Sequence, residues 1–266
     1  MEDSEGKQGR YVQSLERALD IVEVMARQGE PISISELAEK VNLKISTVHR
    51  LLTTMVAKGF VEQNREDNKY KLGLKLWEIG NKVIPPDIRS TAKPFLEELV
   101  QRCEETVNLA ILDGAEVVFI DQEEPERRVV VRMFAQAGNR GPAYCTASGK
   151  ALLAFKPKKE REEIISQINF EKFTTDTITN PDDLRMELER IRGEGYSLDW
   201  GELEEHIRCV AVPVFNYDQL AVAAISVSGV AARMNNAYVH NQILPVIKEV
   251  GRRLSAQLGY LEDQDN

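Results

Sequence analysis

One segment of the sequence places hydrogen-bonding side chains where a soluble helix would usually carry Glu and Lys. It runs from Ser33 to Gly73, and its longest helical stretch extends from Ile45 to about Lys58. The outer face of that stretch carries hydroxyl, imidazole and guanidinium groups, namely Ser46, Thr47, His49, Arg50, Thr53 and Thr54. Such groups donate or accept hydrogen bonds at base edges in the DNA major groove. The alternatives are a solvated polar face or a protein-binding module.

A basic hairpin follows this helical stretch. Two short apolar-polar runs, residues 60–64 and 68–73, flank a polar turn that starts at Arg65. Cations in such a wing contact the sugar–phosphate backbone of DNA and add affinity rather than sequence choice. We expect at least one of Arg65 and Lys69 to make this contact, the alternative being an ordinary charged turn. Tyr70 is expected to pack inside the domain.

A second group of reactive side chains lies near residue 200. His206 and Cys209 are surrounded in sequence by four acids, Asp199, Glu202, Glu204 and Glu205. A Cys nucleophile needs a base that is oriented by a third group. His206 and Cys209 stand three residues apart where a loop enters an apolar strand, which fits no nucleophile motif. A small buried thiol is the preferred interpretation, so we predict no catalytic residue.

The sequence also predicts no metal site and no cofactor. The chain has only three Cys and three His, and Cys103, Cys145 and Cys209 are far apart. The run "CTASGKA" resembles a phosphate-binding loop, which requires a Gly five residues before the Gly of Gly-Lys and a Ser or Thr after the Lys. Tyr144 and Ala151 occupy those two positions, so the nucleotide-binding interpretation fails.

The elements that position the polar helix form a compact pattern. Residues 13–28 have helical apolar spacing, and Ser33 with Glu36 forms a capping-box pair that opens the next helix. Asn42 stands at the tight turn, because Asn tolerates the left-handed conformation. Six apolar side chains of the third helix are expected to face inward: Ile45, Val48, Leu51, Leu52, Met55 and Val56. Three helices and a hairpin predict a winged helix-turn-helix over residues 11–73, after a flexible tail at 1–10.

The rest of the chain predicts a second domain. Residues 74–86 read as a linker helix that is halted by Pro85 and Pro86. The expected strands are a hairpin turning at Asp113-Gly114 and the runs "RRVVVRMF", "GYSLDWGE", "CVAVPVFN" and "LAVAAISVSG". Helices are expected near 88–104, 148–155, 158–168, 181–192 and 235–258. This α+β pattern predicts a mainly antiparallel, GAF/PAS-like sheet domain over residues 87–262.

Composition neither supports nor excludes DNA binding. The net charge is −9, yet residues 10–75 carry 11 Lys and Arg against 9 Asp and Glu, a local charge of +2. No apolar run approaches the ~20 residues that a membrane span needs. The polar N-terminus is no signal peptide, and the odd, scattered cysteines suit a reducing compartment. We expect a cytoplasmic protein with no membrane partner.

Several runs, taken in order, resemble the IclR family of bacterial transcription regulators. They are "VQSLERALDIVEVM", "STVHRLLTTMVAKGFVEQ", "YKLGLKLWEIG", "CTASGKALLAF" and "HIRCVAVPVFN…LAVAAISVSG", and the resemblance extends from about Val12 to Tyr260. The resemblance implies a winged helix joined to an effector-binding domain, a homodimer or homotetramer, and a small organic-acid effector. One departure is Lys44, a poor N-cap where relatives often place Ser or Thr. We expect it to reach a phosphate instead.

The resemblance also implies an effector site built from distant segments. Its walls would be Met133, Ala147, Ser148, Gly149, Asp199, Ile207, Cys209, Ser226 and Ser228. Free N–H groups at the start of the helix "KALLAF" suit a carboxylate, and two serines that alternate along a strand point to one face. Asp199 would repel a carboxylate, so we assign it to a hydroxyl or hydrated keto end of the ligand. Serines that merely hydrogen-bond neighbouring strands are the alternative.

Two functions remain after these arguments. The preferred one is a transcription regulator, a repressor rather than an activator, that binds an inverted repeat in double-stranded operator DNA under the control of an organic acid. The other is a metabolite-binding protein or enzyme whose N-terminal helices serve assembly only. For the regulator, the apolar Leu74, Trp77 and Ile79 of the linker helix are the expected contact between two copies.

Overall fold

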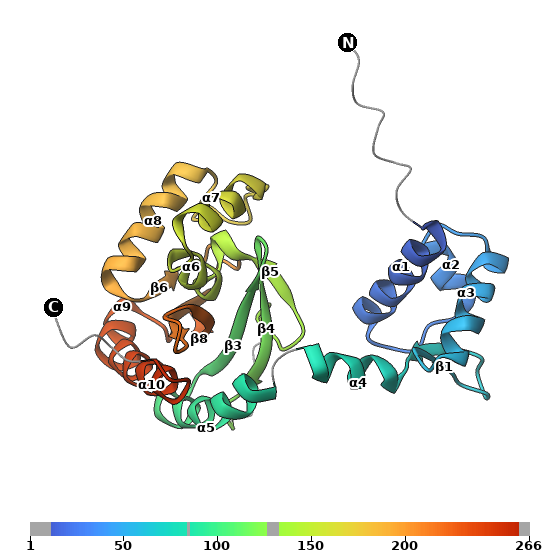
Figure 1. The fold of residues 1–266 in the computed structure, drawn as a ribbon, viewed down its shortest axis with the longest axis horizontal. Helices are drawn as coiled ribbons and strands as arrows, with labels where there is room; N and C mark the ends of the chain where they lie inside the picture. The colour runs from blue at the N-terminus through green and yellow to red at the C-terminus, as the bar shows by residue number, and fades with distance from the viewer. Residues whose placement is uncertain (1–11, 84–85, 127–132, 261–266) are drawn as a thin grey trace, which may run out of the picture. The chain divides into compact units, whose positions relative to one another are not determined.

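A computed structural model describes residues 12–83, 86–126 and 133–260 of the chain. The internal contacts divide it into two compact units, residues 1–86 and 87–266 (Figure 1). Among the described residues, no helix is both long enough and apolar enough to cross a membrane. Each unit has its own hydrophobic core, so the two are described separately.

The first unit is a three-helix domain with a short hairpin. Its elements are α1 (Gln13–Gln28), α2 (Ile34–Lys40), α3 (Ile45–Ala57), β1 (Val61–Gln63), β2 (Tyr70–Leu72) and α4 (Leu74–Val83). Apolar side chains from α1, α2, α3 and the hairpin form one core that includes Ile21, Leu37, Val48 and Leu52, each 0% exposed. The predicted winged helix-turn-helix is therefore confirmed as a fold.

Local signals fix the helix boundaries in this unit. Ser33 Oγ accepts a hydrogen bond from the Glu36 N–H, and Glu36 Oε2 accepts one from the Ser33 N–H at 3.1 Å, so the capping box is present. Asn42 has φ of 49°, the left-handed turn that the sequence predicted. Lys44 is the N-cap of α3 and makes no capping hydrogen bond through its side chain, which leaves its ammonium group available.

The inward face of α3 is narrower than the sequence predicted. Val48, Leu52 and Met55 are buried, but Ile45 is 52% exposed and Val56 is 38% exposed. These two lie at the ends of the buried stripe, where the small core no longer covers the helix. Their helical spacing predicted a place in the core, but spacing does not tell how far along the helix the packing surface extends.

The wing is a two-stranded antiparallel hairpin with Val61 opposite Leu72 and Gln63 opposite Tyr70. Tyr70 is 6% exposed and packs in the core, as predicted. An isolated bridge from Ile32 to Tyr70, which the sequence did not predict, ties the wing to the segment before α2. This contact holds the hairpin against the body of the unit.

The second unit is built on a six-stranded antiparallel sheet. Its strands are β3 (Thr106–Asp113), β4 (Glu116–Glu123), β5 (Arg140–Pro142), β6 (Ser197–Asp199), β7 (Ile207–Phe215) and β8 (Ala221–Val230), in the order β5-β4-β3-β8-β7-β6. The predicted hairpin turn at Asp113-Gly114 is present, and Gly114 has φ of 59°. The short edge strand β5 was missed. The predicted strand "RRVVVRMF" falls almost entirely outside the described residues.

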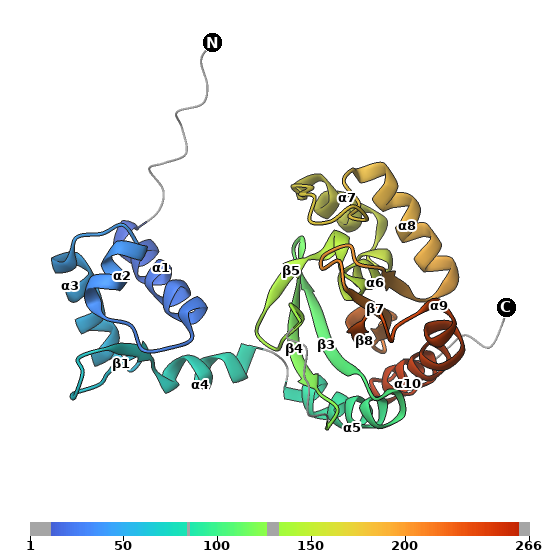
Figure 2. The same cartoon turned by 180° about the vertical axis from the view of Figure 1, so that it is seen from behind.

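Helices cover both faces of this sheet. The elements are α5 (Pro86–Cys103), η1 (Ala143–Cys145), α6 (Ala147–Ala154), α7 (Lys158–Gln167), α8 (Pro181–Glu194), α9 (Asn236–Tyr238), η2 (Val239–Ile243) and α10 (Leu244–Gln257). In both views α5 and α10 lie together, away from α6, α7 and α8 (Figures 1 and 2). Ion pairs of 2.8 Å, Arg102 with Glu249 and Arg253 with Glu98, join α5 to α10.

Small side chains bring α6 close to the sheet. Ala110, Ala211 and Ala224, from three different strands, pack in one cluster with Ala147 and Ala151 of α6. Because none of these side chains is larger than a methyl group, the helix backbone can lie directly on the strands. The predicted final helix is also present, but it is interrupted by the π-helical turn η2 before Pro245, which cannot supply a backbone N–H.

Candidate DNA-binding surface and buried cavity

The polar face of α3 is open to solvent. Ser46, His49, Arg50 and Thr53 are exposed, and Thr47 is partly buried. Thr53 Oγ1 donates to the His49 carbonyl at 2.8 Å, so this hydroxyl can offer only its lone pairs to a partner. Within the described residues, neither His49 nor Arg50 has a hydrogen-bond or ionic partner for its side chain. Both retain their full bonding capacity for an outside ligand.

Cations flank this face at two places in the same unit. Lys44 is exposed at the N-terminus of α3, and Arg65 and Lys69 are exposed on the wing. The wing also carries Glu66 and Asp67, and Asp67 Oδ1 accepts a hydrogen bond from the Lys69 N–H at 3.0 Å. Its net charge is therefore small, and individual cations rather than a basic patch would make the phosphate contacts.

Residues from separate parts of the second unit meet around one buried cavity of ≈ 20 Å³. Eight of the nine residues that the resemblance pointed to line it: Met133, Ala147, Ser148, Asp199, Ile207, Cys209, Ser226 and Ser228. Phe119, Phe134, Ala135, Thr146, Leu203 and Glu204 complete the lining. A volume of this size holds about one or two water molecules.

Gly149 does not line the cavity, contrary to the prediction. A Cβ atom built on it would lie 2.4 Å from the Cα of Ala143. Its N–H donates to Thr146 Oγ1 at 3.3 Å, which caps α6. Gly149 is therefore needed for close packing between α6 and η1, and it influences the cavity only by fixing the start of the helix.

Hydrogen-bond donors converge on the cavity from two sides. Because Thr146 satisfies the N–H of Gly149, the first-turn N–H groups left at the start of α6 belong to Ala147 and Ser148. From β8, Ser226 and Ser228 also line the cavity; they alternate along the strand and are 2% and 1% exposed. Among the described residues that line the cavity there is no Lys, Arg or His. An anion bound here would be held by N–H and O–H dipoles alone.

Two carboxyl groups also border the cavity. Asp199 Oδ1 accepts hydrogen bonds from the N–H groups of Gly201 and Glu202, at 3.0 and 2.7 Å. Burial raises the pKa of Asp199 to about 6, although Lys150 opposes the shift. Glu204 Oε2 accepts from the Phe134 N–H at 2.8 Å and so joins the segment after β6 to the wall that contains Met133. These carboxyls disfavour a second negative charge beside them.

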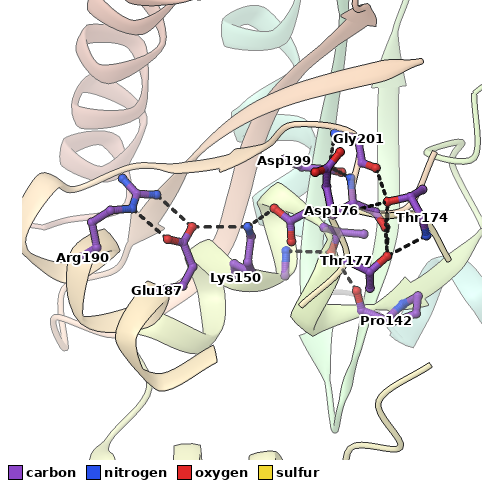
Figure 3. Close-up of polar contacts among 12 residues, drawn as sticks. Pro142, Lys150, Thr174, Asp176, Thr177, Glu187, Arg190, Asp199 and Gly201 are labelled. Atoms are coloured by element: carbon purple, nitrogen blue, oxygen red, sulfur yellow. Dashed lines mark hydrogen bonds and ion pairs between the residues drawn. The ribbon is translucent and has the colours of Figure 1, made fainter. Parts of the chain in front are cut away.

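A buried ion network lies behind Asp199 (Figure 3). Lys150, which is 1% exposed, bonds to Glu202 and, at 3.3 Å, to Glu187, which in turn pairs with Arg190 at 2.8 Å. Burial opposes the charged form of Lys150, but the two glutamates outweigh it and raise its pKa. Burial raises the pKa of Glu202 to about 7, and its Oε2 has no hydrogen-bond partner in the described structure.

Two threonines hold the loop that carries these acids. Thr174 Oγ1 donates to the Gly201 carbonyl at 2.7 Å, and Thr177 Oγ1 donates to the Glu202 carbonyl at 2.6 Å (Figure 3). The Thr174 N–H in turn donates to Thr177 Oγ1 at 2.8 Å. The acidic wall of the cavity is therefore fixed by side chains from the segment between α7 and α8.

Two residues at or beside the cavity, Glu204 and Lys150, were not predicted from the sequence to lie there. Glu204 was noted only as part of a possible nucleophile set, and Lys150 only as part of a failed phosphate loop. The available signal for Lys150 was a single charge within the apolar run "KALLAF", which is typical of a buried and paired cation. The nucleophile set itself does not form, because His206 is exposed and burial raises the pKa of the Cys209 thiol, which keeps it protonated.

A winged helix with an exposed polar face, joined in one chain to a sheet domain, is typical of a DNA-binding transcription regulator. The family model described as the IclR helix-turn-helix domain matches residues 14–65, and that of the bacterial transcriptional regulator IclR C-terminal domain matches residues 83–256. The chain belongs to the IclR family. The enzyme alternative is thereby excluded, since this is a family of transcription regulators.

Individual relatives agree with this assignment. The HTH-type transcriptional regulator XynR of Escherichia coli is 37% identical over 250 residues, which cover 94% of this chain and 98% of XynR. The HTH-type transcriptional repressor AllR of Klebsiella pneumoniae is 34% identical over 95% of this chain and 92% of its own. An IclR homologue from Microbacterium hydrocarbonoxydans, solved in complex with 4-hydroxybenzoate, is 27% identical, has a TM-score of 0.80, and is matched over 92% of this chain and 99% of that chain.

Proposed function

We propose that this regulator is a repressor whose affinity for its operator is controlled by a small organic acid bound in the cavity. The convergence of Ser148, Ser226 and Ser228 on one small cavity carries the proposal, because it brings buried hydroxyls from distant segments to one place where a ligand could bond to them. Within the described residues, the Ser226 hydroxyl has no hydrogen-bond partner. The relative solved with 4-hydroxybenzoate and the relative named as a repressor support the two parts of the proposal.

The acid would be oriented by the charges around it. Its carboxylate is placed against the N–H groups of Ala147 and Ser148 and the hydroxyls of β8, away from Asp199. A hydroxyl or hydrated keto group then faces Asp199 and donates to it. Because a cavity of ≈ 20 Å³ is smaller than such a molecule, binding would displace side chains of the lining. That displacement supplies the conformational change that an effector must produce.

Operator recognition is assigned to the exposed face of α3 and to the flanking cations. Ser46, Thr47, His49, Arg50 and Thr53 would contact base edges, while Lys44, Arg65 and Lys69 would contact phosphates. One winged helix reads one half-site, so an inverted repeat requires a dimer. Leu74, Trp77 and Ile79 of α4, which are 70%, 68% and 42% exposed, support a contact between two copies. The protein would act in the cytoplasm, where its DNA is.

A paired measurement tests the proposal. Thermal unfolding of the full chain is recorded with a panel of small carboxylic acids that includes pyruvate and 4-hydroxybenzoate. A ligand at 100 times its dissociation constant should stabilise the folded state by about 2.7 kcal/mol. The same acid should then release the protein from its own upstream DNA in a gel-shift experiment. Stabilisation without any change in DNA binding would leave a metabolite-binding protein and contradict the regulatory role of the cavity.

A further inference from the structure

A chain of amide groups runs behind the cavity wall and ends at Ser228. Gln122 of β4 lies directly opposite Asn108 of β3 in the sheet register, and Asn108 is 0% exposed. Gln122 Nε2 donates to the Ala135 carbonyl at 2.7 Å and to Asn108 Oδ1 at 3.0 Å. Asn108 Nδ2 donates to Ser228 Oγ at 3.3 Å. Neither Asn108 nor Gln122 lines the cavity.

The direction of this chain is fixed at one end. The Ala135 carbonyl can only accept, so Gln122 must turn its NH₂ group towards it; the reverse orientation would bring two acceptor oxygens together. The second N–H of Gln122 then requires the oxygen of Asn108 as its acceptor. Asn108 must in consequence present its NH₂ group to Ser228. One backbone carbonyl therefore sets the polarity of every hydrogen bond in the chain.

The polarity of these hydrogen bonds determines where the hydroxyl proton of Ser228 points. Because its oxygen accepts from Asn108, its own proton must point elsewhere, and the neighbour on that side is the Cys209 thiol across the strand pair. A thiol is a weak acceptor, so a carboxylate or keto oxygen that enters the cavity offers a better one. Asn108 and Gln122 thus make the wall at Ser228 a donor rather than an acceptor.

We propose that Asn108 and Gln122 are positioning residues that select an acceptor atom of the effector by fixing Ser228 as a hydrogen-bond donor. The inference rests on the proposed organic-acid site. It adds that selectivity for an acid is set outside the cavity lining, by two amides whose orientation is imposed by Ala135. No cation lines the described part of the cavity, so this dipole polarity carries much of the preference for an anion.

The test reverses the polarity without changing shape. In Asn108→Asp, the new carboxylate accepts from Gln122 and also from the Ser228 hydroxyl, so the lone pairs of Ser228 face the cavity. With pyruvate and 4-hydroxybenzoate as titrants in calorimetry of the full chain, the affinity for whichever acid the wild type binds should fall about 10- to 100-fold. Asn216→Asp is the matched control, because Asn216 uses only its side-chain oxygen, as an acceptor in an exposed turn.

A double-mutant cycle separates polarity from the added charge. If Asn108 acts through Ser228, Asn108→Asp in a Ser228→Ala background should change affinity by no more than about two-fold. A direct charge effect would persist undiminished in that background and would overturn the inference. Gln122→Glu repeats the test at the other end of this series of hydrogen bonds, where the side chain is half-buried. A glutamate there accepts from the NH₂ group of Asn108, so Asn108 must turn its oxygen towards Ser228.

The remaining outcomes are equally decisive. A wild-type protein that binds neither acid would overturn the proposed effector class, and the inference would fall with it. Wild-type binding with unchanged affinity in both Asn108→Asp and Gln122→Glu would overturn the inference alone. If Asn108→Asp does not fold, as judged by thermal unfolding, Gln122→Glu alone decides, because its side chain lies nearer to solvent.

Discussion

The polar face of α3 and the cavity of the second unit expose their hydrogen-bonding groups to opposite degrees. On α3 the polar groups are exposed, and His49 and Arg50 have no side-chain partner among the described residues, so both can still bond to an outside molecule. Around the cavity the polar groups are buried, and one of them, Asp199, accepts from the N–H of Glu202, whose side chain pairs with the buried Lys150. We therefore expect substitutions on α3 to change binding alone, and substitutions around the cavity to change binding and stability together.

The largest effect is expected at Lys150. Lys150→Met leaves Glu187 and Glu202 without their buried cation, and breaking a buried ion pair from one side costs about 3–5 kcal/mol. Denaturant unfolding of the full chain at pH 7 measures the loss. Lys159→Met is the control: its side chain is 91% exposed, so its free energy of unfolding should stay within about 0.5 kcal/mol of the wild type.

The pH dependence of that loss sharpens the test. The folded-state pKa values of Asp199 and Glu202 are raised to about 6 and about 7, so both carboxyls are protonated at pH 5. Without Lys150, protonation removes the uncompensated charge, and the deficit should shrink as the pH falls from 7 to 5. A deficit that is the same at both values would show that Lys150 contributes through packing instead of charge.

The comparison also explains what the sequence could predict. Winged-helix elements such as the Ser33–Glu36 capping box and the Asn42 turn are local, so residue types and spacing identify them. Most described strands and helices of the second unit were found in the same way; β5 and η1 were missed, because three residues are too few to show a period. Ile45 and Val56 were assigned to the core because pattern alone carries no information on how far a neighbouring surface extends.

The cavity could be predicted only through family resemblance. Its lining comes from segments as far apart as Phe119 and Ser228, and nothing in the local sequence brings them together. The partners of Lys150 are likewise separated from it by 37 and 52 residues, so the buried network became apparent only in three dimensions. The same holds for the chain from Ala135 through Gln122 and Asn108 to Ser228.

Removal of the donor groups of the cavity should weaken effector binding strongly. Alanine at Ser226 or Ser148 is expected to cost about 1.5–3 kcal/mol of effector affinity for each lost charge-assisted hydrogen bond. Operator binding without effector should persist, because these side chains lie in the second unit. Ser166→Ala on α7 is the matched control, because the Ser166 hydroxyl donates a hydrogen bond only to the Glu163 carbonyl of its own helix. If Ser148, Ser226 and Ser228 are all replaced and the response to the acid is unchanged, the site lies elsewhere.

Substitution on α3 should give the complementary result. Arg50→Ala is expected to lower the discrimination of operator from random DNA by about 1–3 kcal/mol if the guanidinium contacts a base. If it contacts a phosphate, all sequences weaken together and the salt slope becomes shallower by about one. The free energy of unfolding should be unchanged in either case. Arg27→Ala, which removes an exposed cation of α1, is the control, and operator affinity equal to the wild type would exclude both roles for Arg50.

The smallest expected effect is a pH dependence of effector affinity that arises at the cavity. Asp199 takes part in a buried group with Glu202, Glu204 and Lys150, and its folded-state pKa is raised to about 6. Below that pH the carboxyl is neutral and tolerates a bound anion, whereas above it the two negative charges repel each other. Affinity for a carboxylate should therefore fall as the pH rises from 6 to 8, by at most about ten-fold per unit for one linked proton.

The variant Asp199→Asn identifies the group responsible for this dependence. It keeps an oxygen for the N–H groups of Gly201 and Glu202 but cannot ionise, so the fall in affinity should become smaller, with Glu202 as the remaining titrating carboxyl. Calorimetric titration at pH 6, 7 and 8 measures the change, and Glu163→Gln on the exposed face of α7 should leave the wild-type slope intact. An affinity that rises with pH in the wild type would mean that ionised Asp199 attracts the ligand. The effector would then present a cation or a strong hydrogen-bond donor to Asp199, and the proposal that the cavity binds an anion would be wrong.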